Sequence, residues 1–118
     1  MIADHRQHYE QLQRLLAQLG REAAGPMAGF ARLHKEATAP GALSPKIKEL
    51  IALGIGIAVR CESCVGYHVH DALKAGASRA EILETLGVAV LMGGGPALMY
   101  ACEALEALDQ MANPQETR

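Results

Sequence analysis

The chain has 118 residues, of which 50% are hydrophobic, and its formal net charge at pH 7 is −2. This length is typical of a single domain, which we expect to span residues 1–118. The small net charge offers no basic face to a nucleic acid, and three Tyr and one Phe, without Trp, offer no stacking platform for bases.

The N-terminal part of the chain predicts two helices. Residues 4–19 carry leucines at three- and four-residue spacing, and Gly20 follows as a stop signal. Gly25 and Pro26 then open a shorter helix over residues 26–37.

The core of the domain is expected within residues 43–110. Ser44 and Pro45 are a helix start signal, because a serine side chain caps the helix and proline fits its first turn. The helix over residues 46–59 has no charge beyond Glu49, so it is apolar all round and should be buried on every side. Five short helices can barely cover such a helix within one chain, which predicts a homo-oligomer.

The next helix begins near residues 60–62 and stops at Gly76. Ser78 and Glu81 have the spacing of a capping box, which opens a helix that extends to about Met92.

Residues 85–102 form an uncharged segment of 18 residues, so we considered a membrane span. Gly93-Gly94-Gly95-Pro96 lies at its middle and should break the helix, which leaves neither half long enough to cross a membrane. The last helix follows Pro96 and reaches about Met111, and the polar tail 113–118 is expected to fray. The whole pattern predicts an all-α domain of five to six helices.

The cysteines and the N-terminus indicate a reducing compartment. Three cysteines do not make a disulfide scaffold, and the charged N-terminus lacks the apolar segment of a signal peptide, so we expect a soluble, cytoplasmic protein. Cys102 has small apolar neighbours and is expected in the core. His5, His8 and His34 lie among charged residues and are expected on solvated faces.

Cys61, Cys64 and His68 are the residues best suited to chemistry. On a helix with about 100° per residue they share one face, whereas His70 lies on roughly the opposite side. Cys64 and His68 are close enough for a thiol and an imidazole to interact. Cys61 lies in the first turn, where the helix dipole favours a thiolate, so both thiols have a physical reason for a lowered pKa.

Glu49 is the carboxylate that could act with this group. On one continuous helix it would lie roughly 22 Å from Cys64 along the axis. If the two helices instead fold back as a hairpin near Arg60, Glu49 and His68 reach similar heights and could form a proton relay to Cys64.

The residues alone leave three interpretations open. Buried cysteines are often simply small hydrophobic residues. Zinc could bind Cys61, Cys64, His68 and Glu49, although CxxC pairs that bind zinc usually sit in turns and often need a second CxxC, which this chain lacks. The interpretation that we favour is a dithiol–disulfide cycle.

The segment ELIALGIGIAVRCESCVGYHVHDALKAGASRAEILETLGVAVLMGGGPAL resembles the core of the carboxymuconolactone decarboxylase superfamily, on its alkyl hydroperoxidase D-like branch. The signature of that branch is Glu, eleven residues, then Cys-x-x-Cys-x-x-x-His, which Glu49, Cys61, Cys64 and His68 match. The resemblance implies an all-α fold whose short members assemble as oligomers, often trimers or hexamers.

The resemblance also implies a peroxidase reaction that needs no bound cofactor. Cys64 would attack the O–O bond of an organic hydroperoxide and become a sulfenic acid, and Cys61 would resolve it to a disulfide. His68 would take the thiol proton with Glu49 behind it, so all four residues are assigned as catalytic and none as a metal ligand. A lipoyl-bearing or thioredoxin-like protein would then reduce the disulfide.

The sequence departs from the branch at Ser63, where some members carry a histidine immediately before the second cysteine. A hydroxyl cannot act as a base near neutral pH, which predicts a shorter relay and weaker peroxidase activity. The alternatives are a protein disulfide reductase without peroxidase activity and a zinc-holding or redox-sensing structural oligomer. The decarboxylase branch lacks the cysteine pair, so lactone chemistry is not expected.

Overall fold

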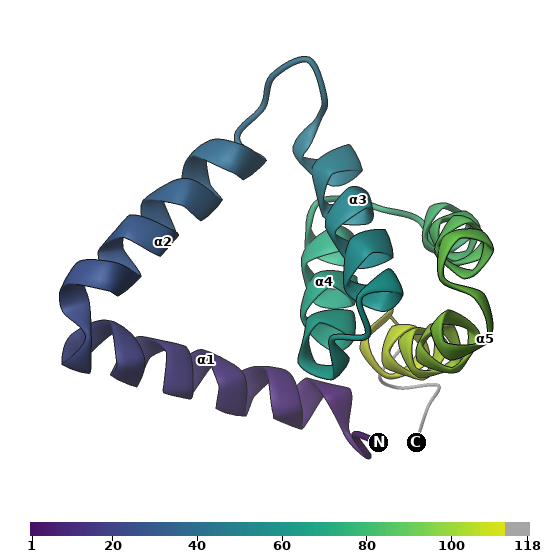
Figure 1. Cartoon of the computed structure of the whole chain (residues 1–118), viewed down its shortest axis with the longest axis horizontal. Coiled ribbons are helices and arrows are strands. Elements are labelled where there is room, and N and C mark those ends of the chain that lie inside the picture. The colour runs from purple at the N-terminus through teal and green to yellow at the C-terminus, as the bar shows by residue number, and fades with distance from the viewer. Residues whose placement is uncertain (113–118) are drawn as a thin grey trace.

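The computed structural model describes residues 1–112, which form helices without a strand among them (Figure 1). The all-α prediction is confirmed, and the predicted tail 113–118 lies outside the described residues. The helices in chain order are α1 (His5–Glu22), α2 (Ala24–Thr38), α3 (Pro45–Ala58), α4 (Glu62–Lys74) and α5 (Arg79–Ala112).

The first two helices form a V-shaped arm beside the rest of the molecule (Figure 1). Asp4 caps α1, because its carboxylate accepts a hydrogen bond from the backbone N–H of Gln7 at 3.0 Å. The predicted stop at Gly20 is wrong, since α1 continues to Glu22. A glycine inside a helix costs about 1 kcal/mol relative to alanine, which a helix of this length tolerates. Ala23 alone separates α1 from α2.

The hydrophobic core lies among α3, α4 and α5, which make the most extensive contacts with one another. Alanines on one side of α5 let the three helices approach closely. The largest fully buried apolar side chains come from all three helices and are Leu53, Ile57, Val65, Val69, Ile82 and Leu108.

Both predicted N-terminal caps are present in this core. The hydroxyl of Ser44 accepts the backbone N–H of Ile47 at 3.2 Å. Ser78 and Glu81 form a reciprocal capping box, with N–H···O distances of 2.8 and 3.1 Å. A hydrogen bond from Lys46, aided by the Ser78 backbone, holds the pKa of Glu81 below its usual value. The starts of α3 and α5 are thereby linked.

Helix α5 is divided at Gly94, as the glycine run predicts. Gly94 has φ 72° and ψ −152°, a conformation that glycine adopts without the penalty of a Cβ atom. By length and composition, Arg79–Met111 could cross a membrane. The break falls within that segment, however, and its side chains Ala104 and Leu108 are buried in the core of the chain itself.

The outer face of α3 stays uncovered in the single chain. Ile47, Ile51 and Ile55 recur every four residues on this face, and with residues of α5 they line an apolar groove of about 580 Å³. The expectation that this helix is buried on every side is therefore wrong for the isolated chain. Helices α4 and α5 cover only the side of α3 that carries Leu53 and Ile57.

Helix α2 is the least supported element. None of its 15 residues is buried against the part of the chain that the structure describes. Phe30 and Leu33 expose 65% and 63% of their surface. These apolar side chains are therefore free to contact another molecule.

Helix α1 is anchored to the core at its N-terminal end. The His5 side chain is fully buried, contrary to the expected solvated face, because this end of α1 packs on α4 and α5. Its backbone N–H donates to the side-chain oxygen of Gln110 at 2.8 Å, and Gln110 donates in turn to the carbonyl of Ala3 at 3.0 Å. The imidazole occupies the space above Gly66, where an added Cβ would lie 2.8 Å from Nδ1.

This buried imidazole should make the fold less stable in mild acid. Burial lowers the pKa of His5 and outweighs the opposing effect of the nearby Glu103 carboxylate. The folded chain therefore binds this proton less readily than the unfolded chain does. The stabilisation is complete above the unfolded pKa of about 6.5 and is lost as the pH falls from there through the lowered folded pKa.

Urea unfolding between about pH 5 and pH 8 measures this effect. The titration of one group can lower the free energy of unfolding by at most about 1.4 kcal/mol per pH unit. We expect the part of the pH dependence that comes from His5 to be absent in His5→Leu. If the free energy of unfolding fell equally with decreasing pH in wild type and His5→Leu, the effect would not come from His5.

Candidate active site

The chain reverses between α3 and α4 in a compact turn at Arg60. The backbone N–H of Arg60 donates to the carbonyl of Ile57 at 3.1 Å, and that of Cys61 donates to Gly56 at 3.0 Å. This is the Schellman pattern, which satisfies the last carbonyl groups of a helix. Arg60 takes the left-handed φ of 61°, as Gly76 does with φ 95° at the end of α4. The turn delivers Cys61 as the N-terminal cap of α4.

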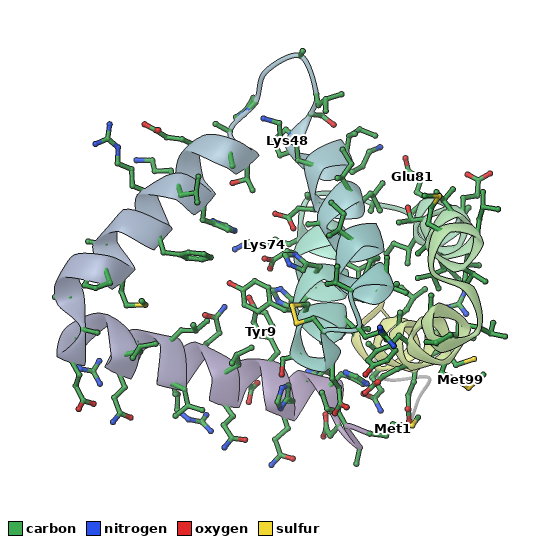
Figure 2. The ribbon with its side chains drawn as sticks, in the orientation of Figure 1. Met1, Tyr9, Lys48, Lys74, Glu81 and Met99 are labelled. Atoms are coloured by element: carbon green, nitrogen blue, oxygen red, sulfur yellow. A yellow bond between two sulfur atoms is a disulfide. The ribbon has the colours of Figure 1, made fainter. Side chains whose placement is uncertain are left out.

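Cys61 and Cys64 lie together at the start of α4 and are joined as a disulfide (Figure 2). Both residues are half-buried. The first backbone N–H groups of a helix carry partial positive charge, which stabilises a thiolate at this place. Gly56 of α3 packs against Cys64.

A methyl group at Gly56 should disturb the dithiol, whereas the same change at Gly54 should not. Alanine in place of glycine normally stabilises a helix by about 1 kcal/mol. At Gly54 the nearest neighbour would be Thr85 Cγ2 at 3.6 Å, an ordinary contact, so this gain should be realised. At Gly56 the new Cβ would lie 3.2 Å from the Cβ of Cys64, and overpacking of about 1–3 kcal/mol should cancel the gain.

Urea unfolding of Gly54→Ala and Gly56→Ala gives the difference directly. Equal stabilisation by the two substitutions would contradict the close packing of α3 on α4 at Cys64.

Glu49 and His68 meet across the α3–α4 pair, as the hairpin interpretation predicts. Nδ1 of His68 lies 3.2 Å from Oε2 of Glu49, which is 7% exposed. A carboxylate can only accept, so Nδ1–H donates to it and Nε2 remains as the nitrogen that can take a proton. His68 follows Cys64 by one helical turn, on the same face of α4.

Tyr67 lies beside this pair, and Tyr9 packs against Tyr67. The Tyr67 ring lies edge-on to that of His68, with centroids 5.4 Å apart. Tyr9 reaches from α1 toward α4 (Figure 2), stacks on His70 at 3.8 Å and donates its hydroxyl to Asp71 at 3.4 Å. Burial raises the pKa of both tyrosines, so they stay neutral and do not act as bases near neutral pH.

The residues placed to hold a metal ion share only Glu49 with the zinc ligands considered in the sequence. One ligand atom each from His34 on α2, Glu49 on α3 and Asp71 on α4 lies within 4.8 Å of the other two. Nitrogen and carboxylate oxygen are donors that divalent ions accept. The three residues come from three helices, so no spacing pattern in the sequence predicts that they lie together. Cys61 and Cys64 bond to each other instead.

Ser63, between the two cysteines, contacts an imidazole from another helix. Nε2 of His8 on α1 lies 3.0 Å from Oγ of Ser63, and both residues are half-buried. The expected solvated face is therefore wrong for His8, because the first turns of α1 lie on α4. His34 is exposed, as expected.

Cys102 is an exposed free thiol, so the expectation of a core residue is wrong. The buried stripe of this part of α5 runs through Ala97, Ala101, Ala104 and Leu108. Cys102 directly follows Ala101 and so points about 100° away from that stripe.

Comparisons with known proteins agree on one family. The profile of the carboxymuconolactone decarboxylase family matches residues 25–107. The fold is similar to the apo crystal structure of a member of that family from Legionella pneumophila, with a TM-score of 0.87, 44% identity and coverage of 92% of this chain and 96% of that one.

Two further relatives extend the comparison. A Thermotoga maritima protein of the same family, with a suggested part in the antioxidative response, has a TM-score of 0.83 and 27% identity, covering 92% of this chain and 93% of that one. An uncharacterised protein of Cupriavidus necator is 34% identical over 111 residues, which are 94% of this chain and 98% of that one.

Proposed function

Because this chain belongs to the carboxymuconolactone decarboxylase family, we propose that it is a thiol-dependent antioxidant enzyme that reduces organic hydroperoxides through Cys61 and Cys64. The observation that carries the proposal is the Glu49–His68 hydrogen bond beside a dithiol that can close to a disulfide. The suggested antioxidative role of the Thermotoga maritima relative supports the same class of reaction.

The first step oxidises Cys64. Its thiolate attacks the terminal oxygen of the hydroperoxide, so that an S–O bond forms while the O–O bond breaks. Cys64 becomes a sulfenic acid and the substrate leaves as an alkoxide. His68 takes the thiol proton at Nε2 and returns it to the alkoxide, which departs as the alcohol. The Glu49 carboxylate holds the imidazole in place and stabilises its protonated form.

The second step closes the disulfide. The thiolate of Cys61 attacks the sulfur of the sulfenic acid, an S–S bond forms and the S–O bond breaks. Hydroxide leaves and, with the proton that the Cys61 thiol released, becomes water. Cys61 caps the N-terminus of α4, Cys64 lies in its first turn, and the two are bonded in the structure, so the step needs no change in the packing of the helices.

We propose that a dithiol protein, lipoyl-bearing or thioredoxin-like, returns the disulfide to the thiols in the cytoplasm. Reduction proceeds by thiol–disulfide exchange through a mixed disulfide, which requires access to one sulfur atom. The half-buried state of both cysteines is compatible with such access. Turnover of a hydroperoxide with each class of carrier would identify the reductant.

We also propose that the protein works as a homo-oligomer, a trimer or a hexamer. The apolar groove of α3 and the exposed apolar residues of α2 are separate surfaces, as an assembly with more than one kind of interface requires. Stable interfaces bury about 800 Å² per partner. Sedimentation equilibrium measures the mass, and a monomer at working concentration would contradict this proposal.

The peroxidase proposal is tested by stopped-flow mixing of reduced, metal-free protein with cumene hydroperoxide and with hydrogen peroxide. Rapid formation of one disulfide per chain supports it. Oxidation no faster than that of a free thiol would exclude it and favour a disulfide reductase without peroxidase activity. A zinc-holding oligomer would instead contain stoichiometric zinc and unfold on chelation.

A further inference from the structure

We infer that His8, acting through the hydroxyl of Ser63, is a second proton relay that serves Cys61, as His68 serves Cys64. The inference rests on the proposed dithiol chemistry and adds to it a residue of α1, a helix outside the segment that carries both cysteines. The observation behind it is the 3.0 Å contact between His8 Nε2 and Ser63 Oγ.

Helix α4 itself supplies an imidazole to only one of the two thiols. The residue one helical turn after Cys64 is His68, whereas the residue four positions after Cys61 is Val65, which is fully buried in the core. Both thiols must lose a proton before they can be joined. Cys61 has no such acceptor on α4, and Ser63 lies two residues after it, inside the four-residue loop that the disulfide closes.

Residues of α1 on either side of His8 in the sequence fix its position. The His5 backbone N–H donates to Gln110, and the ring of Tyr9 stacks on His70 at 3.8 Å. The docking of α1 thus fixes the position of His8 next to Ser63, so the imidazole is not a freely moving surface side chain. Docked in this way, α1 brings an imidazole to the start of α4.

The proton of the Cys61 thiol passes to His8 through the hydroxyl of Ser63. The Ser63 hydroxyl donates its hydrogen to Nε2 of neutral His8 while its oxygen accepts the proton of the Cys61 thiol. Cys61 becomes a thiolate and His8 an imidazolium, with Ser63 unchanged. The Cys61 thiolate then attacks the sulfenic sulfur of Cys64, an S–S bond forms and the S–O bond breaks. The hydroxide that leaves receives the proton of the His8 imidazolium through Ser63 and becomes water, which returns His8 to its neutral form.

The test measures Cys61 without any peroxide. In a Cys64→Ser background, iodoacetamide alkylation of Cys61 is followed by mass spectrometry across neutral pH, with the exposed Cys102 as the internal reference thiol. His8→Gln keeps a hydrogen-bonding amide but cannot accept the proton. We expect it to slow alkylation of Cys61 relative to Cys102 by about tenfold, the equivalent of one pKa unit.

Two substitutions at Ser63 separate the relay from a structural role. Ser63→Ala should slow the alkylation of Cys61 relative to Cys102, as His8→Gln does. Ser63→Thr keeps the hydroxyl and should preserve the rate of Cys61 alkylation. Gln110→Ala removes the anchor of α1 that holds His8 at Ser63, so it should also slow the alkylation of Cys61. An unchanged Cys61 to Cys102 ratio in both His8→Gln and Ser63→Ala would overturn the inference.

The same variants with both cysteines present distinguish this inference from the proposed function. After mixing with cumene hydroperoxide, His8→Gln should form sulfenic acid at the wild-type rate and close the disulfide more slowly. A wild-type protein that forms no sulfenic acid would overturn the peroxidase proposal, while the alkylation ratio would still decide for or against His8.

Discussion

Replacing Cys64 with Ser is expected to abolish the reaction with cumene hydroperoxide, with a rate loss of at least about 10³-fold, down to that of an ordinary thiol. Cys64 alone has His68 one turn away, and His68 is backed by the buried Glu49 at 3.2 Å. A serine hydroxyl in that place is neither ionised nor nucleophilic toward the O–O bond. Stopped-flow oxidation of the reduced variant measures the loss.

Cys61→Ser is the matched control, because it removes the other sulfur from the same turn of α4. This variant should react with peroxide at nearly the wild-type rate and stop at the sulfenic acid of Cys64, which dimedone traps for mass spectrometry. A Cys61→Ser protein that is inert beside an active Cys64→Ser protein would reverse the two roles. Thermal unfolding of both variants shows whether the fold is retained.

Glu49→Gln is expected to slow sulfenic acid formation by about 10²-fold, since general acid–base groups contribute about 10²–10⁴-fold to the rate. Glutamine has nearly the same shape as glutamate, so the packing of the side chain should change little. The amide can still hydrogen-bond to Nδ1 of His68, but it carries no charge to stabilise the imidazolium. Because Glu49 and His68 act as one unit, the double variant with His68→Gln should be no slower than His68→Gln alone.

The control for Glu49→Gln is Glu103→Gln. Glu103 is also a buried carboxylate, with 5% exposure, but it lies on α5 and accepts the backbone N–H of Ile2 at 3.1 Å. The two substitutions remove the same charge from similar burial. Equal slowing of sulfenic acid formation by both would show that the loss comes from general destabilisation rather than from the relay.

Features of the fold that depend on neighbours in the chain could be predicted from the sequence. The caps at Ser44 and Ser78 are made within three residues, and the break at Gly94 reflects the backbone freedom of one residue. The meeting of Glu49 and His68 could also be anticipated, because a single turn at Arg60 is enough to bring them together.

Features that depend on packing between distant segments could not be predicted. The His8–Ser63 contact joins residues 55 positions apart and exists only because α1 docks on α4. The same docking buries His5 among residues that look solvated in the sequence. The exposure of Cys102 could not be predicted for a related reason. Leu98, Ala101 and Leu105 near it in the sequence are apolar, and only the packing of α5 decides which side of the helix faces the core.

The compact α3–α4 hairpin also has a consequence for biosynthesis. All four residues of the proposed reaction lie between Glu49 and His68, on two helices joined by one turn. Contacts this close in sequence form early in folding. A growing chain therefore carries both thiols and their proton acceptor before α5, which completes the core around α3 and α4, has been translated. We expect an oxidant that reaches the nascent chain to close the disulfide before folding is complete.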